Sequence, residues 1–288
     1  MPTVIQPAPT AGPRLARRVL PADGTNPELE LIEVDALGQN AGQAPVLCVH
    51  GAFAGAWMWE PFLHHLARSG RSGAALSFRG HGQSGGAARL REARLSHYVG
   101  DVLRVIEQFD EPPVVIGHSL GALIAQQLLG RVRMRGLIML APVPPEGMFL
   151  STPRLLAGEP ALYTRLVEGL RSSAVADFEP IKQLVFSERS TPSDVAWHGA
   201  RMVLEPIAVL LDAHLPYPTL SAYLLRTPTL VVGADQDRLV PIDVSMRTAL
   251  YHGGEHVTVR GHGHLMHLEG GAEEIAGVVS RWLQAAKL

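Results

Sequence analysis

The chain has 288 residues, of which 47% are hydrophobic and 18% are charged, and its net charge at pH 7 is -2. These values describe an ordinary globular protein with a full core, and they provide no basic footprint for nucleic acid. The single cysteine, Cys48, excludes an internal disulfide and a cysteine-based zinc cage, and its apolar surroundings predict a small buried side chain.

The first segments predict a surface arm followed by an edge pair of strands. Residues 1–18 contain four prolines and lack the apolar stretch of a secretory signal, so we expect a disordered or surface-wrapping arm. The segments 15–20 and 29–35 alternate more clearly in polarity, which indicates an antiparallel edge pair. No stretch approaches the ~20 apolar residues that a membrane span needs, and we expect a cytoplasmic protein.

Strand and helix patterns then alternate along the chain. Short apolar runs bounded by turn residues predict strands at 45–50, 73–78, 112–117, 136–140, 227–232 and 255–260. Helical patterns fill the intervals at 57–69, 96–109, 119–130, 242–251 and 272–286. Most of the runs are apolar throughout, as expected of strands that are covered on both faces of a parallel sheet. We therefore predict an α/β fold with a mostly parallel central sheet, flanking helices and right-handed crossovers.

This alternation breaks between about 142 and 226, where prolines and helical fragments occur without a convincing strand. A block of this length is too long for a simple crossover. We predict an inserted helical cap at 143–221 and a core formed by 1–142 and 222–288. The cap is rich in leucine, methionine, valine and proline. This composition is consistent with an apolar substrate pocket, and equally with the apolar underside that any cap needs in order to pack on the core.

The segment GHSLG at 117–121 has the G-x-S-x-G spacing of a nucleophile at a strand-to-helix turn. The apolar run PVVI precedes it, and the helical pattern ALIAQQLL follows it. A sharp turn strains the backbone at Ser119, and glycines two positions away on either side avoid a collision. The hydroxyl would project above the sheet beside a helix N-terminus, whose amides favour developing negative charge. Ser119 is therefore the predicted nucleophile.

An earlier strand ends in HGAFAGAWMW, a loop of small residues. Such a loop supplies one N–H of an oxyanion hole, and the residue after the nucleophile supplies the other. We assign these roles to the amides of Ala52 and Leu120, with Phe53 as the alternative loop donor. Phe53 and His118 are also expected to contact the substrate.

Five motifs resemble those of the α/β-hydrolase fold superfamily in their order and spacing. They are HGAFAGAWMWE, SFRGHGQSGG, GHSLG, GADQDRLVP and GHLMHLE, and the resemblance covers about 45–141 and 227–288. It implies a serine esterase or lipase-like fold with a helical cap and catalytic residues in the chain order Ser, Asp, His. We interpret His50 and His81, in the first two motifs, as side chains that hold their loops.

The resemblance implies one acid and one base. The acid of the family stands four positions before a proline, so Asp237 fits this role, whereas Asp235 serves the turn. The base belongs to a Gly-His pair followed by an apolar residue and Glu, and this pattern selects His264. His262 is the competing residue, but it stands two positions out of register.

The run RGHGHLMHLEGG, with His262, His264 and His267, also resembles the histidine cluster of a metal site. Metallo-β-lactamase-type sites place Asp immediately before the third histidine, where this chain has Met266. They also draw ligands from later strands, and only a helix is predicted to follow. We predict no metal and no cofactor, and we expect His267 to pack or hydrogen bond locally.

The predicted activity is hydrolysis of a carboxylic ester with an apolar acyl or alcohol part, through an acyl-enzyme on Ser119. The serine argues against haloalkane dehalogenases and epoxide hydrolases of similar sequence, which use Asp there. Leu265 stands where related cyanide lyases carry Lys. Thioesterase, lactonase, carbon–carbon bond hydrolase and non-catalytic receptor are the alternatives. The expected partner is a small molecule, and the sequence does not indicate an oligomeric state.

Overall fold

The computed structural model describes residues 13–38, 43–150, 184–269 and 272–288, together with Ala157, Pro160, Thr164 and Lys182. The part of the expected N-terminal arm up to residue 12 lies outside the described residues. So does a large part of the predicted cap, including 165–181.

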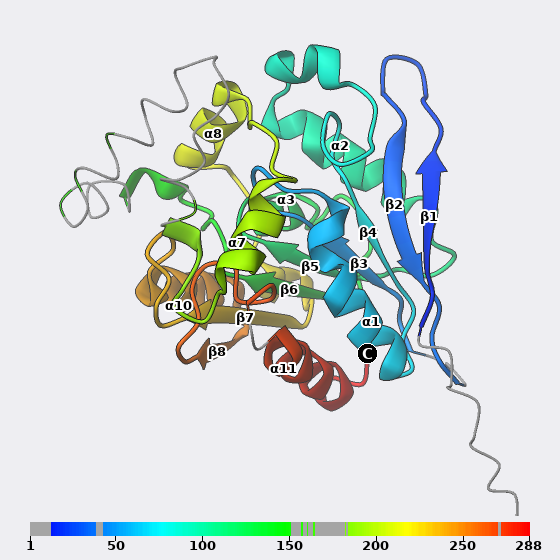
Figure 1. The fold of residues 1–288 in the computed structure, drawn as a ribbon. Coiled ribbons are helices and arrows are strands. Elements are labelled where there is room, and N and C mark those ends of the chain that lie inside the picture. Colours follow the sequence, from blue (N-terminus) through cyan, green and yellow to red (C-terminus); the bar gives the residue numbers. More distant parts are fainter. Residues whose placement is uncertain are drawn as a thin grey trace, which may run out of the picture.

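An eight-stranded sheet forms the centre of the molecule (Figure 1). Its strands, in sheet order, are β1 (Leu15–Leu20), β2 (Leu29–Val34), β4 (Gly73–Leu76), β3 (Val46–Val49), β5 (Val114–His118), β6 (Gly136–Leu140), β7 (Thr229–Ala234) and β8 (Glu255–Val259). β2 is antiparallel to both of its neighbours, and the strands from β4 to β8 run parallel. The predicted fold class and the predicted edge pair are confirmed, with small differences at the strand ends.

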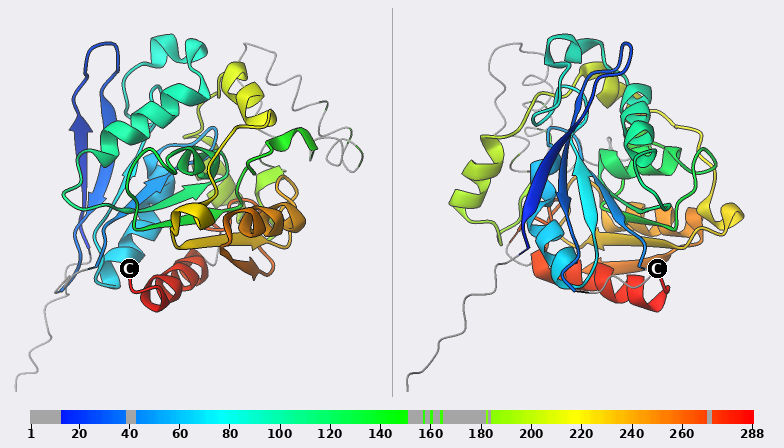
Figure 2. Two further views of the ribbon diagram at one scale, coloured as in Figure 1. Left: turned by 180° about the vertical axis from the view of Figure 1, so that it is seen from behind. Right: turned by 90° about the vertical axis from the view of Figure 1, so that its right-hand side faces the viewer.

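Helices cover both faces of this sheet. Within the described residues they are η1 (Ala56–Trp59), α1 (Glu60–Arg68), η2 (Ala87–Glu92), α2 (Leu95–Ile106), α3 (Leu120–Gln127), η3 (Met148–Leu150), α7 (Pro192–Gly199), α8 (Ile207–His214), α9 (Ala222–Leu225), α10 (Ile242–His252) and α11 (Ala272–Ala285). α1 and α11 pack together on one face, and α2, α3 and α10 lie on the other (Figure 2). Across the described ranges, no helix combines the length and apolar character needed to cross a membrane.

The sheet divides the core into two layers because successive side chains of a strand point to opposite faces. In β3, Leu47 and Val49 belong to the layer beneath α2, α3 and α10, whereas Val46 and Cys48 belong to the layer beneath α1 and α11. All four side chains are fully buried, as the uniformly apolar run predicts. Because both faces are covered, polar chemistry is left to the loops at the strand ends.

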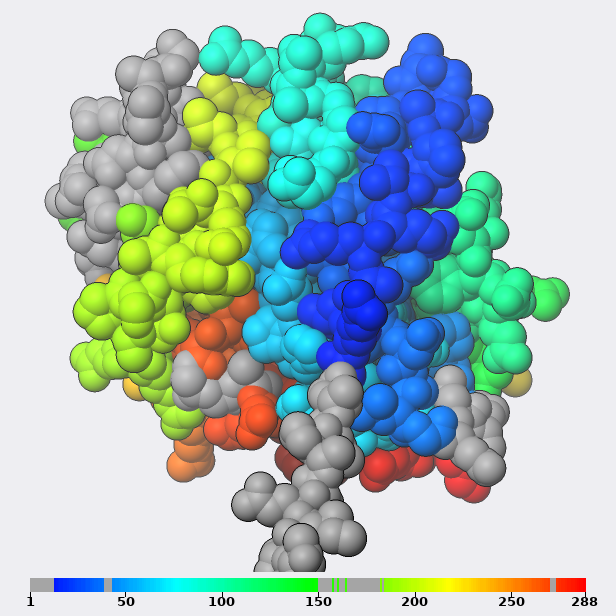
Figure 3. Space-filling model, turned by 45° about the vertical axis from the view of Figure 1, so that its right-hand side comes forward, coloured from blue at the N-terminus to red at the C-terminus, as the bar shows by residue number. Residues whose placement is uncertain are grey.

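The segment 143–221, which the sequence predicts to be a cap and which is called the cap below, leaves the sheet after β6 and precedes β7. Between 143 and 221 the described residues form helices and coil but no strand. Side chains of α7 and α8 line one cavity together with residues that follow the parallel strands, so this segment lies over their carboxyl ends. The space-filling view shows the α7 region against the segment near residue 265 (Figure 3), where the Leu265 amide donates to the Val185 carbonyl over 3.1 Å.

Candidate active site

Ser119 lies in the turn between β5 and α3, with backbone angles φ 53° and ψ -117°. L-residues other than glycine rarely adopt a positive φ, and positions of this kind concentrate at functional sites. Its own amide donates to the Leu140 carbonyl of β6, and its carbonyl accepts from the Ala122 and Val143 amides. The neighbouring strand and helix therefore hold the strained turn in place.

The glycines on either side are required by close backbone approach. A Cβ added to Gly117 would stand 2.5 Å from the Gly121 carbonyl oxygen. One added to Gly121 would stand 2.9 Å from the His50 carbonyl carbon and overlap the carbonyl oxygens of Val49 and His50. Backbone atoms in a sheet cannot move aside as a flexible side chain can. The two glycines thus bring the start of α3 directly against the loop that follows β3.

The loop after β3 and the start of α3 each carry one amide assigned to an oxyanion hole. Within the described part of the chain, the N–H groups of Ala52 and Leu120 donate to no protein acceptor. The amide of Phe53, the alternative donor, instead donates to the Glu205 carboxylate over 2.9 Å. The structure therefore leaves Ala52 and Leu120 as available donors and engages Phe53 elsewhere.

His264 and Asp237 form a buried pair beside the same cavity. The Nδ1 atom of His264 lies 2.8 Å from Asp237 Oδ2. Since a carboxylate only accepts hydrogen bonds, this nitrogen carries the proton, and in the neutral ring Nε2 retains a lone pair. The other carboxylate oxygen accepts from the Leu239 and Val240 amides, each over 2.8 Å, so the acid is held from both sides. Ser119 and His264, both described, line one cavity without a direct hydrogen bond between them.

The competing residues lie in other surroundings. Asp235 is exposed, and it accepts from the Gly261 amide. His262 is buried away from the cavity, with its Nε2 accepting from Arg189 over 3.0 Å and its Nδ1 3.4 Å from Glu269. The geometry therefore separates them from Ser119.

Glu269 joins the loop that carries His264 to the cap. Its two oxygens accept from the Ser187 amide and hydroxyl, each over 2.8 Å, and from the Gly263 amide over 3.1 Å. The LE pattern that selects His264 in the sequence therefore has a structural basis. Its glutamate holds this loop against the cap segment.

Two further histidines lie behind His264. His118 lines the cavity, and its Nε2 donates to the His264 carbonyl over 2.9 Å. Burial, together with the nearby His267 and His264 rings, holds the pKa of His118 well below its usual value. His267 packs on Trp59 with ring centroids 4.6 Å apart, and burial lowers the pKa of His267 to about 3. Both rings are neutral at ordinary pH; His118 acts as a hydrogen-bonding group, whereas His267 acts by packing, because neither of its ring nitrogens has a hydrogen-bond partner among the described residues.

The loop histidines occupy the positions expected of loop-holding side chains. His50 donates through Nδ1 to the Gly51 carbonyl over 2.7 Å, and its Nε2 accepts from the Phe78 amide over 3.0 Å. His81 contacts the Arg79 carbonyl through Nδ1 and lies 3.3 Å from the Glu205 carboxylate through Nε2. Neither side chain lines the cavity.

The cavity has a volume of about 190 Å³ and is lined mainly by Leu, Met, Val and Ala side chains from the core and the cap. Among the described residues that line it, none is Lys, Arg, Asp or Glu. Phe53, which the sequence places in the pocket, does line it. So do His198 and His214 of the cap, which the sequence analysis missed, and Trp57.

The cap histidines carry no local sequence signal for their position. Thr191 and Asp194 form a capping box, which marks the start of α7, but this pattern does not show which face meets the core. His198 stacks on Trp57 at 5.6 Å between ring centroids, and burial lowers the pKa of His198 to about 4. His214 donates through Nδ1 to the Leu210 carbonyl over 2.7 Å. The cap thus contributes uncharged His198 to the wall opposite the strand ends.

The histidine run does not converge on a common point. No group of three or more His, Cys, Asp or Glu side chains has the geometry to hold a metal ion anywhere in the described ranges. The histidines of the run point into different surroundings, because His264 faces Asp237, His262 faces Arg189 and His267 lies on Trp59.

The chain belongs to the alpha/beta hydrolase family, whose model matches residues 46–278. That match spans the sheet from β3, the elbow, the cap segment and the first half of α11, and it confirms the family that the motifs predict.

Solved structures share this fold at low sequence identity. An esterase from Thermogutta terrifontis is 20% identical with a TM-score of 0.72, over 94% of this chain and 99% of that chain. An esterase from Exiguobacterium antarcticum is 18% identical with a TM-score of 0.72, over 90% and 96%. A bromoperoxidase from Bacillus anthracis is 16% identical with a TM-score of 0.75, over 93% and 100%. At this identity the likeness establishes the fold and leaves the reaction to be argued from the site.

Proposed function

We propose that this protein is a serine hydrolase that cleaves a small, uncharged carboxylic ester. The observation that carries the proposal is the His264–Asp237 hydrogen bond, since it leaves the Nε2 lone pair available beside Ser119. The strained elbow and the two unengaged amides support the same reading.

In the proposed mechanism, Ser119 Oγ attacks the ester carbonyl carbon while His264 Nε2 accepts the hydroxyl proton. Asp237 stabilises the imidazolium and keeps its orientation. The amides of Ala52 and Leu120 donate to the oxyanion of the tetrahedral intermediate. His264 then returns the proton to the leaving alcohol, and water, activated by the same nitrogen, releases the acid and regenerates Ser119.

The lining of the cavity supports an uncharged, largely apolar substrate. A substrate carboxylate or ammonium group would be buried without a partner, because no described lining residue has a formal charge of its own. This argues against hydrolases of dienone acids, which must bind a carboxylate. The same proposal assigns 143–221 to a cap that supplies the apolar wall.

The test is turnover of p-nitrophenyl esters from acetate to dodecanoate, together with labelling by a fluorophosphonate. The wild-type protein should be labelled on Ser119 and should show an optimum at a short or medium chain. Ser119→Ala should lose the label and at least about 10⁴-fold in kcat, with its thermal unfolding retained. Turnover that persists in Ser119→Ala would exclude this mechanism, and tight ligand binding without turnover in the wild type would favour a receptor.

A further inference from the structure

Glu205 is a buried carboxylate of the cap, in the coil between α7 and α8, and only 4% of it is exposed. One oxygen accepts the Phe53 amide over 2.9 Å, and the other accepts the Tyr98 hydroxyl. His81 Nε2 lies 3.3 Å from the oxygen that holds Phe53. A buried carboxylate needs such partners, and these three all belong to the core rather than to the cap.

The backbone of Phe53 is held by the cap on both sides. Its φ is 65°, a backbone conformation that residues other than glycine rarely adopt. The Phe53 N–H donates to Glu205, and the Phe53 carbonyl accepts from the Val203 amide over 2.9 Å. Two residues of one cap segment therefore fix the two peptide units that flank Phe53.

The neighbouring peptide unit contains the Ala52 N–H. His50 donates to the Gly51 carbonyl. In a trans peptide the carbonyl and the following N–H point in opposite directions, so this contact turns the Ala52 N–H away from His50. Glu205 holds the next unit through the Phe53 N–H. The core thus fixes the peptide unit before Ala52, and the cap fixes the peptide unit after it.

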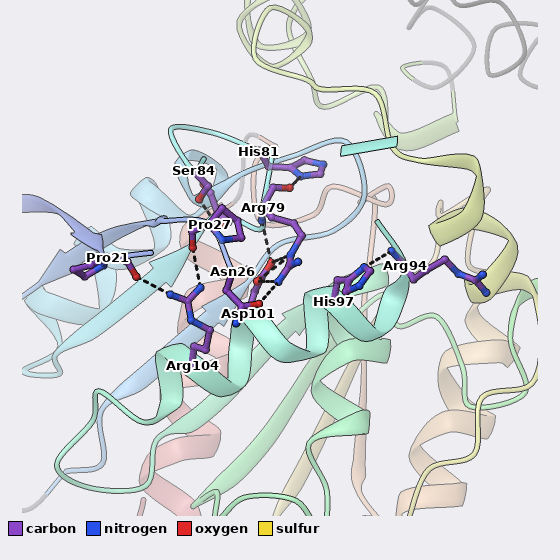
Figure 4. A network of polar contacts seen from close by, with 11 residues as sticks. Pro21, Asn26, Pro27, Arg79, His81, Ser84, Arg94, His97, Asp101 and Arg104 are labelled. Atoms are coloured by element: carbon purple, nitrogen blue, oxygen red, sulfur yellow. Dashed lines mark hydrogen bonds and ion pairs between the residues drawn. The ribbon is translucent and has the colours of Figure 1, made fainter. Parts of the chain in front are cut away.

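The core partners of Glu205 are themselves fixed. Figure 4 shows Arg79, on the loop of His81, directed at Asp101 of α2, with a separation of 2.6 Å. Tyr98 stacks on Phe78 with ring centroids 4.6 Å apart and an interplanar angle of 3°. Burial lowers the pKa of His81, but the Glu205 carboxylate and further hydrogen bonds raise it above its usual value overall. Glu205 therefore contacts core side chains that are held by further contacts within the core.

We propose that Glu205 is a positioning residue that holds the oxyanion loop, so that docking of the cap sets the direction of the Ala52 amide. The inference rests on the proposed function, because it concerns the oxyanion hole of that reaction. Glu205 does not line the cavity, so its effect would pass through Phe53 and Ala52. A carboxylate that only tied the cap to the core would affect stability and leave the transition state unchanged.

The test compares Glu205→Leu, which removes both acceptors, with Glu205→Gln, whose amide oxygen can still accept the Phe53 N–H. Asp212→Asn is the matched control, because Asp212 is another cap carboxylate that binds the core, through Arg94 and the Leu95 amide, away from the loop. Each variant is measured for kcat and KM on p-nitrophenyl butyrate, with active sites counted by fluorophosphonate titration. The Ki values of an alkyl trifluoromethyl ketone, which forms an oxyanion on serine, and of the matching methyl ketone are measured alongside.

We expect Glu205→Leu to lower kcat per titrated site by about 10- to 100-fold, with KM changed by less than about threefold. The Ki of the trifluoromethyl ketone should rise by the same factor as kcat falls, while that of the methyl ketone stays constant. Glu205→Gln should retain kcat within about threefold, since it keeps the acceptor. Asp212→Asn should change thermal unfolding but neither kcat nor the Ki values.

The inference is overturned if Glu205→Leu keeps the wild-type kcat per site, or if the two ketones lose affinity equally. If Glu205→Leu does not fold, Glu205→Asp carries the same test. It keeps the charge but withdraws the carboxylate from Phe53, so kcat should again fall. Failure of the proposed function looks different, because the wild type would then show no turnover and no Ser119 label, and this inference would fall with it.

Discussion

The two walls of the cavity differ in what holds their side chains. The core wall presents Ser119 and His264, which stand at strand ends and are fixed by backbone and side-chain hydrogen bonds. The cap wall presents mainly apolar residues such as Leu184 and Met202, together with His198 and His214. Hydrogen bonds join the two walls at Phe53, which contacts Val203 and Glu205, and at Leu265, whose amide donates to the Val185 carbonyl.

This difference indicates a division of labour. Groups that must keep an orientation to within a few tenths of an ångström stand on the rigid sheet, where neighbouring backbone atoms oppose any shift. Groups that only need to exclude water and match a shape stand on the cap. Substitutions in the core wall should therefore affect the rate of the chemical step, and substitutions in the cap wall should affect which ester binds.

The largest expected effect is that of Asp237→Asn, which acts through His264 of the core wall. The amide can donate to His264 Nδ1, which reverses the tautomer and removes the lone pair from Nε2, the proposed proton acceptor. We expect kcat to fall by about 10⁴-fold with little change in KM, measured by steady-state hydrolysis of p-nitrophenyl butyrate. Asp235→Asn, two residues away and outside the cavity, is the control and should retain activity. Equal losses in the two variants would remove the distinction between these carboxylates.

The second effect tests the rigidity of the elbow. Gly121→Ala would place a Cβ against backbone atoms of Val49 and His50, so we expect a loss of about 3 kcal/mol in the free energy of unfolding. Gly100→Ala in α2 is the control. A Cβ there meets nothing within 4 Å, and the change should stabilise the protein by about 0.5–1 kcal/mol. Urea denaturation measures both, and equal values would show that the elbow tolerates displacement.

The third effect is the pH dependence of stability. Burial lowers the pKa of His50, His118, His198, His252 and His267, on both walls and in the core between. A histidine with a lowered folded pKa stabilises the protein above its unfolded value of about 6.5, and this contribution is lost as the pH falls toward the folded value. Stability should therefore decline from pH 6.5 downward, by about 1.4 kcal/mol per pH unit for each group that titrates.

His267→Phe isolates one of these contributions. The phenyl ring can keep the stack on Trp59 without a proton to bind, so the slope of unfolding free energy against pH should shrink by about 1.4 kcal/mol per unit between pH 6 and 4. The free energy of unfolding, measured in urea at several pH values, tests this. An unchanged slope in the variant would show that His267 contributes nothing to acid sensitivity.

The smallest effect concerns the cap wall. Met202→Ala should make room for a longer acyl chain, and each methylene that it buries should add about 0.8 kcal/mol, or roughly fourfold in kcat/KM. The optimum in the ester panel should move to longer chains. Leu250→Ala, at an exposed position of α10 outside the cavity, should leave the profile as it was. A shift in both variants, or in neither, would contradict the role given to the cap wall.

Local patterns predict the elbow because its constraints are local. The sheet run, the two glycines and the helical pattern around Ser119 all lie within a few residues, and each follows from sterics at one turn. The pairing of Asp237 with His264 spans 27 residues, and the family register, rather than periodicity, selects it. The structure brings these two residues together, and their catalytic roles remain predictions.

Glu205 illustrates what local patterns do not reveal. It lies 152 residues from Phe53 in the chain, in a segment without a recognisable motif. Its contact depends on how the cap docks, and docking depends on the sum of many apolar contacts that no short window of sequence contains. The same reason explains why His198 and His214 were not expected in the cavity.

The sequence by itself determined the alternation of strands and helices, the buried central strands such as β3 and β5, and the strained turn at Ser119, because these follow from spacing and side-chain size along the chain. The family register selected His264 and offered Ala52 or Phe53 as the loop donor, but only the tertiary structure decided that His264 meets Asp237 and that, of these two amides, Phe53 is the one with a carboxylate acceptor. Those choices depend on atoms that are distant in sequence and adjacent in space, where one hydrogen bond to Glu205 engages Phe53 and leaves Ala52 available.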